Sequence, residues 1–468
     1  MSKVQCRNAV ETRSANGPKH EVLLAPSGDA LPAQGIQQAI DACGARGGGR
    51  VVLRAGRYRT GTLVMRSGVT LHLEKDAVLV ASGNIGDYLR KEPVSGAHPH
   101  RAIPTAMLFA EDVEGIALTG EGTIDGNGEA FYRDRTPSDP PPADWVEPKK
   151  ALGTWIPAFH TLMTQRERPR AEILFINCRG VRIENVRIRN SPQWTLFLLA
   201  CTDVVVRGID LHSPVNCPNG DGIDVDGCSD VLVEDCDITT GDDAVCLKNT
   251  NTWGLARTSR NVTVRRCRLR ATAHAFCIGT ETQADFENVI LEDLEIAPYD
   301  GYGLTGIGLS ILEGAAIRGV RVSNVRIADI NMPLYIRLGA ECHGMAKPVG
   351  AIGDIVFENL TARGVTGNSF LTGQPGHPLR NIAMRNIRIE FAGVIDHDRV
   401  MREVPLLETE YAVNTIWRFL PSYGLFCRLV DGLRLSDVHI TGPATEKRPA
   451  VVLKNVREFS SQNLTVTE

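Results

Sequence analysis

The sequence has few aromatic residues and no long apolar stretch. Phenylalanine, tryptophan and tyrosine together make up 6% of the 468 residues, whereas glycine occurs 45 times. Together with frequent valine, isoleucine and leucine, this balance is typical of many short strands and tight turns rather than of helices. The composition therefore predicts a mostly β fold.

The chain also lacks a basic run and a segment long enough to cross a membrane. Its formal net charge is −4, so neither nucleic acid nor a membrane is an expected partner. The first thirty residues carry charges and contain no apolar stretch of signal-peptide length. We therefore expect a cytoplasmic protein, or a secreted or periplasmic one if a leader has been removed.

Paired cysteine motifs are absent as well. Twelve cysteines occur, but none form a Cys-x-x-Cys pair, which argues against a zinc site built on that motif. Several occupy apolar positions of a repeat, among them Cys236 and Cys267, where a thiol behaves as a small hydrophobe. We expect reduced, buried and stacked cysteines.

What the sequence does contain is a repeat in which two alternating apolar residues are followed, three positions later, by a third. The first two alternate as in a strand, and Asn, Asp or Gly usually precedes the third, where the chain should bend. Leucine-rich repeats have a different pattern, so the repeat predicts an all-β solenoid, a right-handed parallel β-helix. The nine copies begin at Val181, Val204, Val231, Val262, Val289, Val320, Ile355, Ile382 and Leu433.

The predicted organisation is a single domain over residues 1–468, with an N-terminal cap region at 20–50 and coils over 51–468. Within the cap region, residues 33–44 show the apolar spacing of an amphipathic helix that would cover the first coil. Four interruptions of the repeat are expected to form loops on one face, at residues 128–172, 249–260, 329–354 and 392–430.

Tryptophans gather at these interruptions. Trp145, Trp155, Trp253 and Trp417 fall within them, and Trp194 directly follows an apolar segment. An indole ring suits the apolar face of a sugar, but it equally suits the packing of a loop onto the coil. Both interpretations remain open, and Trp194 is a candidate substrate contact.

Two acidic motifs stand out within residues 216–249. Asn219-Gly220-Asp221 and Gly241-Asp242-Asp243 are spaced by about one repeat, so on a solenoid they would lie on successive coils, roughly 4.8 Å apart. Crowded carboxylates have pKa values that move apart, as an acid–base pair requires. Ordinary turn chemistry and calcium binding are the alternatives from the residues alone.

With these motifs on neighbouring coils, the sequence resembles the polygalacturonase family of glycoside hydrolases, family 28, and is similar to its bacterial exo-acting members. The resemblance implies an inverting hydrolysis in which Asp242 is the general acid and Asp221 and Asp243 activate water. His274, in Ala273-His274-Ala275, matches the histidine of the family's Gly-His-Gly motif. An oligosaccharide substrate, with no metal and no cofactor, is implied.

The sequence departs from the family at two places. The alanines beside His274 replace glycines and are expected to add methyl groups next to the cleft. Where the family carries an Arg-x-Lys pair that holds the galacturonate carboxylate, this chain has Gly308 and Ser310. A neutral sugar such as rhamnose, or a modified uronide, is therefore expected at the cleaved bond, unless Lys248 or Arg337 supplies a cation.

The other candidate substrate contacts are Asn219, Glu281 and Glu313. Three alternative functions remain: a galacturonate-specific exo-polygalacturonase with a relocated cation, a β-helical polysaccharide lyase, and a non-catalytic carbohydrate-binding or tail-spike protein. A lyase would need a basic residue at its centre, and a tail spike would be trimeric. We expect an enzyme that is a monomer or a weak homo-oligomer.

Overall fold

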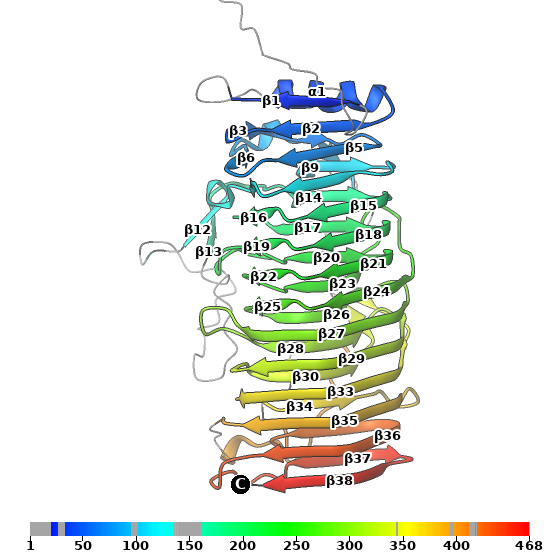
Figure 1. Ribbon diagram of the computed structural model, residues 1–468. Coiled ribbons are helices and arrows are strands. Elements are labelled where there is room, and N and C mark those ends of the chain that lie inside the picture. The colour runs from blue at the N-terminus through cyan, green and yellow to red at the C-terminus, as the bar shows by residue number, and fades with distance from the viewer. Residues whose placement is uncertain are drawn as a thin grey trace, which may run out of the picture.

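The computed structural model describes residues 20–26, 33–94, 102–134, 136, 138, 161–342, 345–393, 397–410, 417 and 419–467. Short strands stack in parallel into one 32-stranded sheet that winds along the molecule from the N-terminal to the C-terminal end (Figure 1). The predicted parallel β-helix is confirmed. None of the helices in these residues is long and apolar enough to span a membrane.

Each complete rung contributes one strand to each of three ladders, and each strand pairs with the equivalent strand of the rungs above and below it. The first ladder contains β4 (Leu63–Val64), β9 (Ala106–Glu111), β14 (Ala171–Ile176), β17 (Trp194–Leu199), β20 (Ile223–Asp226), β23 (Val245–Asn249), β26 (His274–Thr282), β28 (Thr305–Ile311), β30 (Met332–Leu338) and β34 (Ser369–Thr372).

The second ladder contains β1 (Glu21–Leu24), β2 (Gly49–Leu53), β5 (Val69–Leu73), β10 (Ala117–Gly120), β15 (Arg179–Glu184), β18 (Thr202–Arg207), β21 (Ser229–Glu234) and β24 (Ser259–Arg265). The third contains β3 (Gly56–Thr60), β6 (Ala77–Ala81), β11 (Thr123–Asp125), β16 (Arg187–Arg189), β19 (Asp210–His212), β22 (Asp237–Thr240) and β25 (Arg268–Ala271).

Toward the C-terminal end the second and third ladders run through longer strands without a break. These are β27 (Phe286–Pro298), β29 (Ala316–Ala328), β33 (Ala351–Val365), β35 (Leu379–Phe391) and β36 (Leu425–Thr441). The first residues of β36 also pair with β34, so this strand continues all three ladders. Its N-terminal part pairs with β37 (Val451–Arg457) and its C-terminal part with β38 (Ser460–Thr467). The elements outside the rungs are α1 (Ala33–Ala45), η1 (Ile85–Asp87), η2 (Gly128–Ala130), η5 (His397–Arg399), and the antiparallel pairs β7 (Arg90–Lys91) with β8 (Ile103–Pro104), β12 (Tyr132–Asp134) with β13 (Thr161–Met163), and β31 (Glu341–Cys342) with β32 (Met345–Ala346).

The bend predicted within each repeat is a single residue in the left-handed region. Asn, Asp and Gly tolerate this conformation best, which explains their place in the sequence pattern. Asparagine side chains also stack there: the Nδ2 of Asn359 donates to Oδ1 of Asn324 at 3.0 Å, and that of Asn386 to Asn359 at 2.8 Å. The nine bend residues are Asn185, Gly208, Asp235, Arg266, Asp293, Asn324, Asn359, Asn386 and Asp437.

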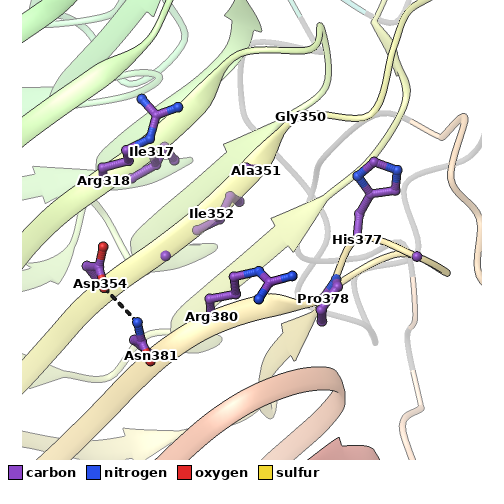
Figure 2. Close-up of a pocket in the computed structure, with 12 residues that line it drawn as sticks. Ile317, Arg318, Gly350, Ala351, Ile352, Asp354, His377, Pro378, Arg380 and Asn381 are labelled. Atoms are coloured by element: carbon purple, nitrogen blue, oxygen red, sulfur yellow. Dashed lines mark hydrogen bonds between the residues drawn. The ribbon is translucent and has the colours of Figure 1, made fainter.

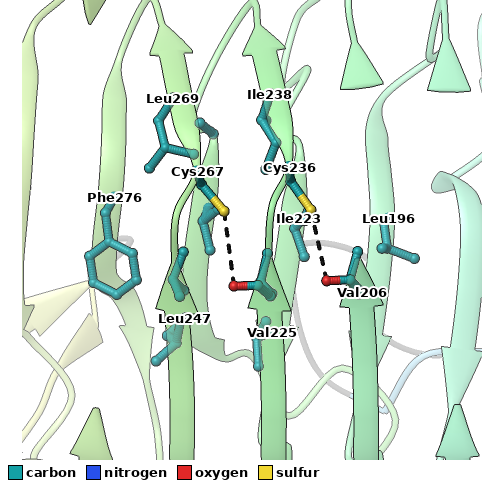
Figure 3. Close-up of a cluster of buried hydrophobic side chains, with 14 of the residues drawn as sticks. Leu196, Val206, Ile223, Val225, Cys236, Ile238, Leu247, Cys267, Leu269 and Phe276 are labelled. Carbon is teal, nitrogen blue, oxygen red and sulfur yellow. Dashed lines mark hydrogen bonds between the residues drawn. The ribbon is translucent and has the colours of Figure 1, made fainter. Parts of the chain in front are cut away.

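One hydrophobic core follows the axis of the coil from Val22 to Ala450. Figure 3 shows a section of it, in which Cys236 and Cys267 point inward among aliphatic side chains, each sulfur facing a backbone carbonyl. The ten cysteines whose side chains the structure describes are buried and free, as predicted. Stacking of thiols on neighbouring rungs is confirmed for Cys178, Cys201 and Cys228, for Cys236 with Cys267, and for Cys246 with Cys277.

The cap helix is also confirmed. Helix α1 covers the residues that the apolar spacing indicated, and Ile36, Ile40 and Cys43 are buried against the first rungs. The helix thereby shields an apolar end of the coil that would otherwise face water.

The predicted interruption at 329–354 is wrong in part, because it contains β30, a regular strand of the first ladder. The repeat used to find the coils records only the second and third ladders, so a first-ladder strand was counted as an insertion. The interruption at 249–260 holds the chain between β23 and β24. Those at 128–172 and 392–430 lie partly outside the described residues.

Candidate active site

The acidic motifs lie on successive rungs of the first ladder. Asp221 precedes β20, and Asp242 and Asp243 precede β23, which pairs with β20 in parallel. The backbone N–H of Gly222 donates to the carbonyl oxygen of Asp243 at 2.8 Å, and His274 begins β26 on the following rung. The structure therefore brings the three aspartates and the histidine together at the N-terminal ends of neighbouring strands.

Two glycines allow the acidic turns to approach this closely. A Cβ atom on Gly222 would lie 2.5 Å from the carbonyl oxygen of Ala244, and one on Gly241 would lie 2.3 Å from that of Pro214. Real Cβ atoms do not come so near to backbone oxygen. Gly241 and Gly222, the residue after Asp221, are therefore required by packing, in addition to any chemistry of their neighbours.

A buried ammonium group holds Asp221. The Nζ of Lys248 lies 2.7 Å from Oδ2 of Asp221 and 2.9 Å from Oδ1 of Asp224, with all three side chains almost completely buried. Burial alone would lower the pKa of Lys248, but the two carboxylates outweigh it and raise that pKa well above its usual value. Burial also raises the pKa of both aspartates, more strongly for Asp224.

Asp243 is held by three donors from the next rung. Its Oδ1 accepts hydrogen bonds from the backbone N–H of His274 at 3.0 Å and pairs with Nδ1 of that ring at 2.7 Å, while its Oδ2 accepts from Sγ of Cys277 at 3.1 Å. Burial would raise the pKa of Asp243, but His274 above all, with Lys248 and Cys277, lowers it below its usual value. Asp243 is therefore ionised over the whole neutral range.

Asp242 has the opposite environment. No side-chain hydrogen bond or ion pair reaches its carboxyl group from the described residues, and the group is only partly buried. Burial first, and then the charges of Asp221 and Asp243, raise its pKa well above the usual value. Adjacent positions thus hold one carboxyl group whose pKa is raised and one whose pKa is lowered, and general acid–base catalysis requires such a difference between the acid and the base.

Two arginines that the sequence analysis missed lie beside this cluster. Arg168 donates through Nη1 to the carbonyl oxygens of Pro192 and Pro218 and through Nη2 to Oδ1 of Asn219 at 3.0 Å. The guanidinium carbon of Arg170 lies 3.9 Å from the centre of the Trp194 ring, and Nζ of Lys248 lies 4.1 Å from the same centre.

A signal for these arginines was present in the sequence. Arg168-Pro-Arg170 directly precedes the apolar run of β14, as Asp221 precedes β20. Both strands belong to the first ladder, two rungs apart, so their N-terminal ends share one side of the coil.

The remaining predicted contacts fall into two groups. Asn219 is exposed at the mouth of the cluster, in a left-handed turn, and Glu281 interacts electrostatically with Asp221 and Lys248. Glu313 instead accepts the backbone N–H of Thr282 at 2.7 Å, which secures the end of β26.

Arg337 is not placed to bind a substrate. Its side chain is completely buried, and its Nη2 donates to the carbonyl oxygens of Leu407 and Glu410 at 2.5 and 2.6 Å. The guanidinium therefore fixes the segment at 397–410 to the coil. The expectation that Arg337 supplies a cation to the substrate is corrected on this ground.

The structure gives a reason for the missing cations at Gly308 and Ser310. Gly308 pairs with Tyr335 on the next rung, and a Cβ atom at position 308 would lie 2.7 Å from the tyrosine ring. The Tyr335 hydroxyl lies 3.3 Å from Nε2 of His274. Ser310 is buried and donates to the carbonyl oxygen of Ile278 at 3.0 Å. Neither position offers a group to a substrate carboxylate.

The alanines beside His274 do not crowd the cleft as expected. Ala275 packs into the main hydrophobic core, so its methyl group points away from the acidic cluster. Ala273 is also buried. The loss of the glycines therefore places no exposed methyl group beside the acidic cluster.

The described tryptophans are packing residues. Trp253 and Trp417 are buried, the first beside Phe197 and the second against Phe370. Trp194 is buried as well, in edge contact with Phe197, and presents its ring to Lys248 and Arg170. Trp145 and Trp155 lie outside the described residues.

One set of donors near the cluster fits a metal ion. Ligand atoms of Asp243, His274 and Cys277 all lie within 4.8 Å of one another, and a carboxylate, an imidazole and a thiol are ligands that Zn²⁺ accepts. In the structure, His274 and Cys277 each form a hydrogen bond with Asp243 instead. A metal ion bound by these three residues would be coordinated by the carboxylate of Asp243. That carboxylate could then not act as a base, so a metal at this position does not fit a reaction in which Asp243 is the base.

A pocket on another part of the coil is unrelated to the cluster. It has a volume of about 340 Å³ and is lined by β29, β33 and β35 together with the turn at His377 (Figure 2). Arg318 at its edge is paired with Asp285 at 2.8 Å, and Asn381 donates to Asp354 at 2.9 Å. None of the predicted site residues lines it.

We expect Cys277 to influence how kcat/KM decreases at acidic pH. The hydrogen bond from its thiol to Oδ2 of Asp243 helps to keep the pKa of Asp243 low. The carboxylate must be ionised to act as a base. We expect Cys277→Ala to raise that pKa, so that kcat/KM falls at acidic pH while the neutral plateau changes little.

The hydroxyl of Cys277→Ser can make the same bond and should restore the acid limb. The measurement is kcat/KM against pH for the three proteins. An acid limb that is identical in all of them would mean that the thiol contributes nothing to the state of Asp243.

Comparison with known proteins identifies the family of this chain. The family described as glycosyl hydrolases family 28 matches residues 97–406. The chain is 26% identical to a "Probable polygalacturonase" of Vitis vinifera over 84% of this chain and 80% of that protein. It is also 26% identical to an "Exo-poly-alpha-D-galacturonosidase" of Dickeya chrysanthemi, over 73% of this chain and 61% of that protein.

Solved structures show the same fold. An exopolygalacturonase from Thermotoga maritima superposes with a TM-score of 0.61 at 20% identity, covering 78% of this chain and 88% of that one. A polygalacturonase from Erwinia carotovora gives 0.59 at 21% identity, covering 82% and 96%. Because the family match covers well over half of the sequence, the chain belongs to glycosyl hydrolase family 28 and is a glycoside hydrolase.

Proposed function

We propose that the protein hydrolyses pectin-type oligosaccharides with inversion at the anomeric carbon. Asp242 donates a proton to the glycosidic oxygen, and Asp221 and Asp243 orient and deprotonate the attacking water on the opposite face of the sugar. The observation that carries this proposal is the contrast between Asp242, whose pKa is raised by burial, and Asp243, whose pKa is lowered by His274. Inverting glycosidases use such a pair of carboxyl groups with room between them for water.

We further propose that the enzyme acts from the chain end. Two proteins similar to this one carry the names exo-poly-α-D-galacturonosidase and exopolygalacturonase, which supports this mode. An endo-polygalacturonase of Pectobacterium carotovorum is equally similar, at 26% identity, so the mode needs its own test.

The sugar at the cleaved bond need not be neutral. The expectation of rhamnose rested on Gly308 and Ser310, and the named relatives, all polygalacturonases or galacturonosidases, give it no support. A pectic chain that contains galacturonate is therefore the first substrate to try, with a rhamnose-containing pectic oligosaccharide as the comparison.

One experiment tests both parts of the proposal. Proton NMR of a galacturonate trimer or tetramer during the first turnovers identifies the anomer formed and the size of the released unit. We expect the anomer opposite in configuration to the cleaved bond, and early release of one small unit from an end. A first product that retains the configuration would contradict the assignment of the two bases, and early mid-chain products would contradict the exo mode.

A further inference from the structure

Among the described residues, positions 308 and 310 of β28 give the acidic cluster no cation. On the rungs that follow the cluster toward the C-terminus, Gly308 lies against the Tyr335 ring, and Ser310 donates a hydrogen bond to a backbone carbonyl. Lys248 belongs to the cluster, but its ammonium group is already shared between Asp221 and Asp224. Any cation that binds a charged sugar must therefore come from elsewhere.

Arg170 lies on the other side of the cluster, immediately before β14. Its neighbour Ala171 pairs with Trp194, and its backbone N–H donates to the carbonyl oxygen of Pro104 at 3.1 Å. These contacts place the guanidinium carbon 3.9 Å from the centre of the Trp194 ring. Because the same ring also carries the Lys248 ammonium group, Arg170 lies next to the ion pair that holds Asp221.

The guanidinium of Arg170 contacts the Trp194 ring, but it has no polar partner among the described residues. Among the described residues, no side-chain hydrogen bond or ion pair reaches it, and its buried Nε has no partner. Arg168, two positions earlier, is a useful contrast, because it makes three hydrogen bonds to carbonyl and amide oxygens. A buried donor without a partner costs free energy unless a ligand satisfies it.

The carboxylates around Arg170 interact with it through space. Burial lowers its pKa, and Glu281, Asp224 and Asp221, in that order, oppose the shift. These groups keep the guanidinium within the site, and the stacking on Trp194 fixes its plane.

The shape of the group indicates its ligand. A guanidinium presents parallel N–H groups that match the two oxygens of a carboxylate. We propose that Arg170, stacked on Trp194, binds the carboxylate of a uronate residue next to the cleaved bond and so replaces the cations that Gly308 and Ser310 do not provide. This inference rests on the proposed function, and it makes Arg170 a residue that determines specificity.

The test compares two substrates that have the same sugar units but differ in whether their carboxyl groups are free and charged or esterified and neutral. A galacturonate trimer and its methyl ester are assayed with the wild type and with Arg170→Gln, Arg170→Lys and the control Arg166→Gln, an exposed arginine in the same segment. Loss of hydrogen bonds to a charged group should lower kcat/KM for the free acid by about 10- to 150-fold in Arg170→Gln, with a much smaller change for the ester. Arg166→Gln should keep the wild-type ratio of acid to ester.

Arg170→Lys guards against a folding defect. It retains the charge but loses the paired donors, so it should fold with an unchanged circular dichroism spectrum and still lose part of its preference for the acid. An equal loss on both substrates in the two Arg170 variants would show that the arginine only maintains the site, and would overturn the proposal.

A binding measurement tests the role of Arg170 independently of the proposed reaction. In an Asp242→Asn background, calorimetry with the galacturonate trimer should give a dissociation constant that Arg170→Gln increases about 10-fold or more. An unchanged dissociation constant would overturn the role of Arg170, whatever the activity. If the wild type cleaves no pectic oligosaccharide while Arg170-dependent binding persists, the proposed reaction fails and the binding site stands.

Discussion

Asp242→Asn should abolish turnover and leave the fold intact. An amide is nearly isosteric with a carboxyl group but cannot donate the proton that a leaving oxygen requires, and positioned proton transfer contributes about 10² to 10⁴-fold to a rate. We expect kcat to fall by at least that range, measured by reducing-sugar release from a galacturonate oligomer. Among the described residues, no side-chain hydrogen bond holds this carboxyl group, so no structural contact is lost with it.

The stability of this variant provides the control. Because the folded-state pKa of Asp242 is raised, its ionised form destabilises the native protein at pH values above its usual pKa. Replacing it by a neutral side chain should therefore leave the unfolding temperature at neutral pH unchanged or slightly higher. Asp230→Asn, at an exposed turn, should have wild-type activity. Substantial turnover by Asp242→Asn would remove this residue as the general acid.

Lys248→Met should reduce both stability and activity. Its ammonium group is the partner of two buried carboxyl groups, and removal of one member of a buried pair typically costs about 3–5 kcal/mol. We expect the free energy of unfolding in urea to fall by that amount at neutral pH. Because the folded-state pKa of Lys248 is raised, its stabilising contribution is complete at neutral pH and is lost only as pH rises through that value.

Lys248→Met should also lose activity. Without the ammonium group the pKa of Asp221 is higher, so Asp221 stays protonated and cannot serve as a base. The expected loss in kcat/KM is at least about 10²-fold. Lys91→Met is the matched control: this lysine pairs with Glu111 at 2.8 Å on the surface, where such pairs contribute about 1 kcal/mol or less.

A double variant, Lys248→Met with Asp224→Asn, separates charge from packing. Asp224 is the more deeply buried carboxyl group, so its neutralisation should recover part of the lost stability without restoring activity. Wild-type stability in the single variant would show that Asp221 and Asp224 are both protonated in the native protein and that the ion pair is absent.

The fold was predictable because its signal is local and repeated. Each rung buries the same three apolar positions, such as Val231, Val233 and Cys236, and each bend needs a residue that tolerates the left-handed region. Because this requirement recurs nine times in the sequence, the β-helix could be predicted from it. The first-ladder strands carry a different pattern, because both of their faces are buried. Every residue of β30 is buried, so its sequence does not alternate between apolar and polar residues, and the strand was mistaken for part of an insertion.

The acidic cluster was predictable for the same reason. Asp221 and Asp242 are one repeat apart, and equal positions on successive rungs become neighbours. Arg337 failed as a predicted cation, because nothing in the sequence near it shows that carbonyl groups of the segment at 397–410 surround its guanidinium. Arg170 was missed although it precedes a strand of the same ladder as Asp221.

The sequence by itself determined the repeat, the cap helix, the family resemblance and the positions of Asp221, Asp242, Asp243 and His274. These depend on spacing along the chain, which the coil converts directly into proximity. Only the tertiary structure decided which charges satisfy one another: that Lys248 is shared by Asp221 and Asp224, that Cys277 supports Asp243, and that Arg170 stays unpaired on Trp194. The physical reason is that burial and hydrogen bonding set a charge's partners and its pKa, and both depend on side chains from several rungs at once.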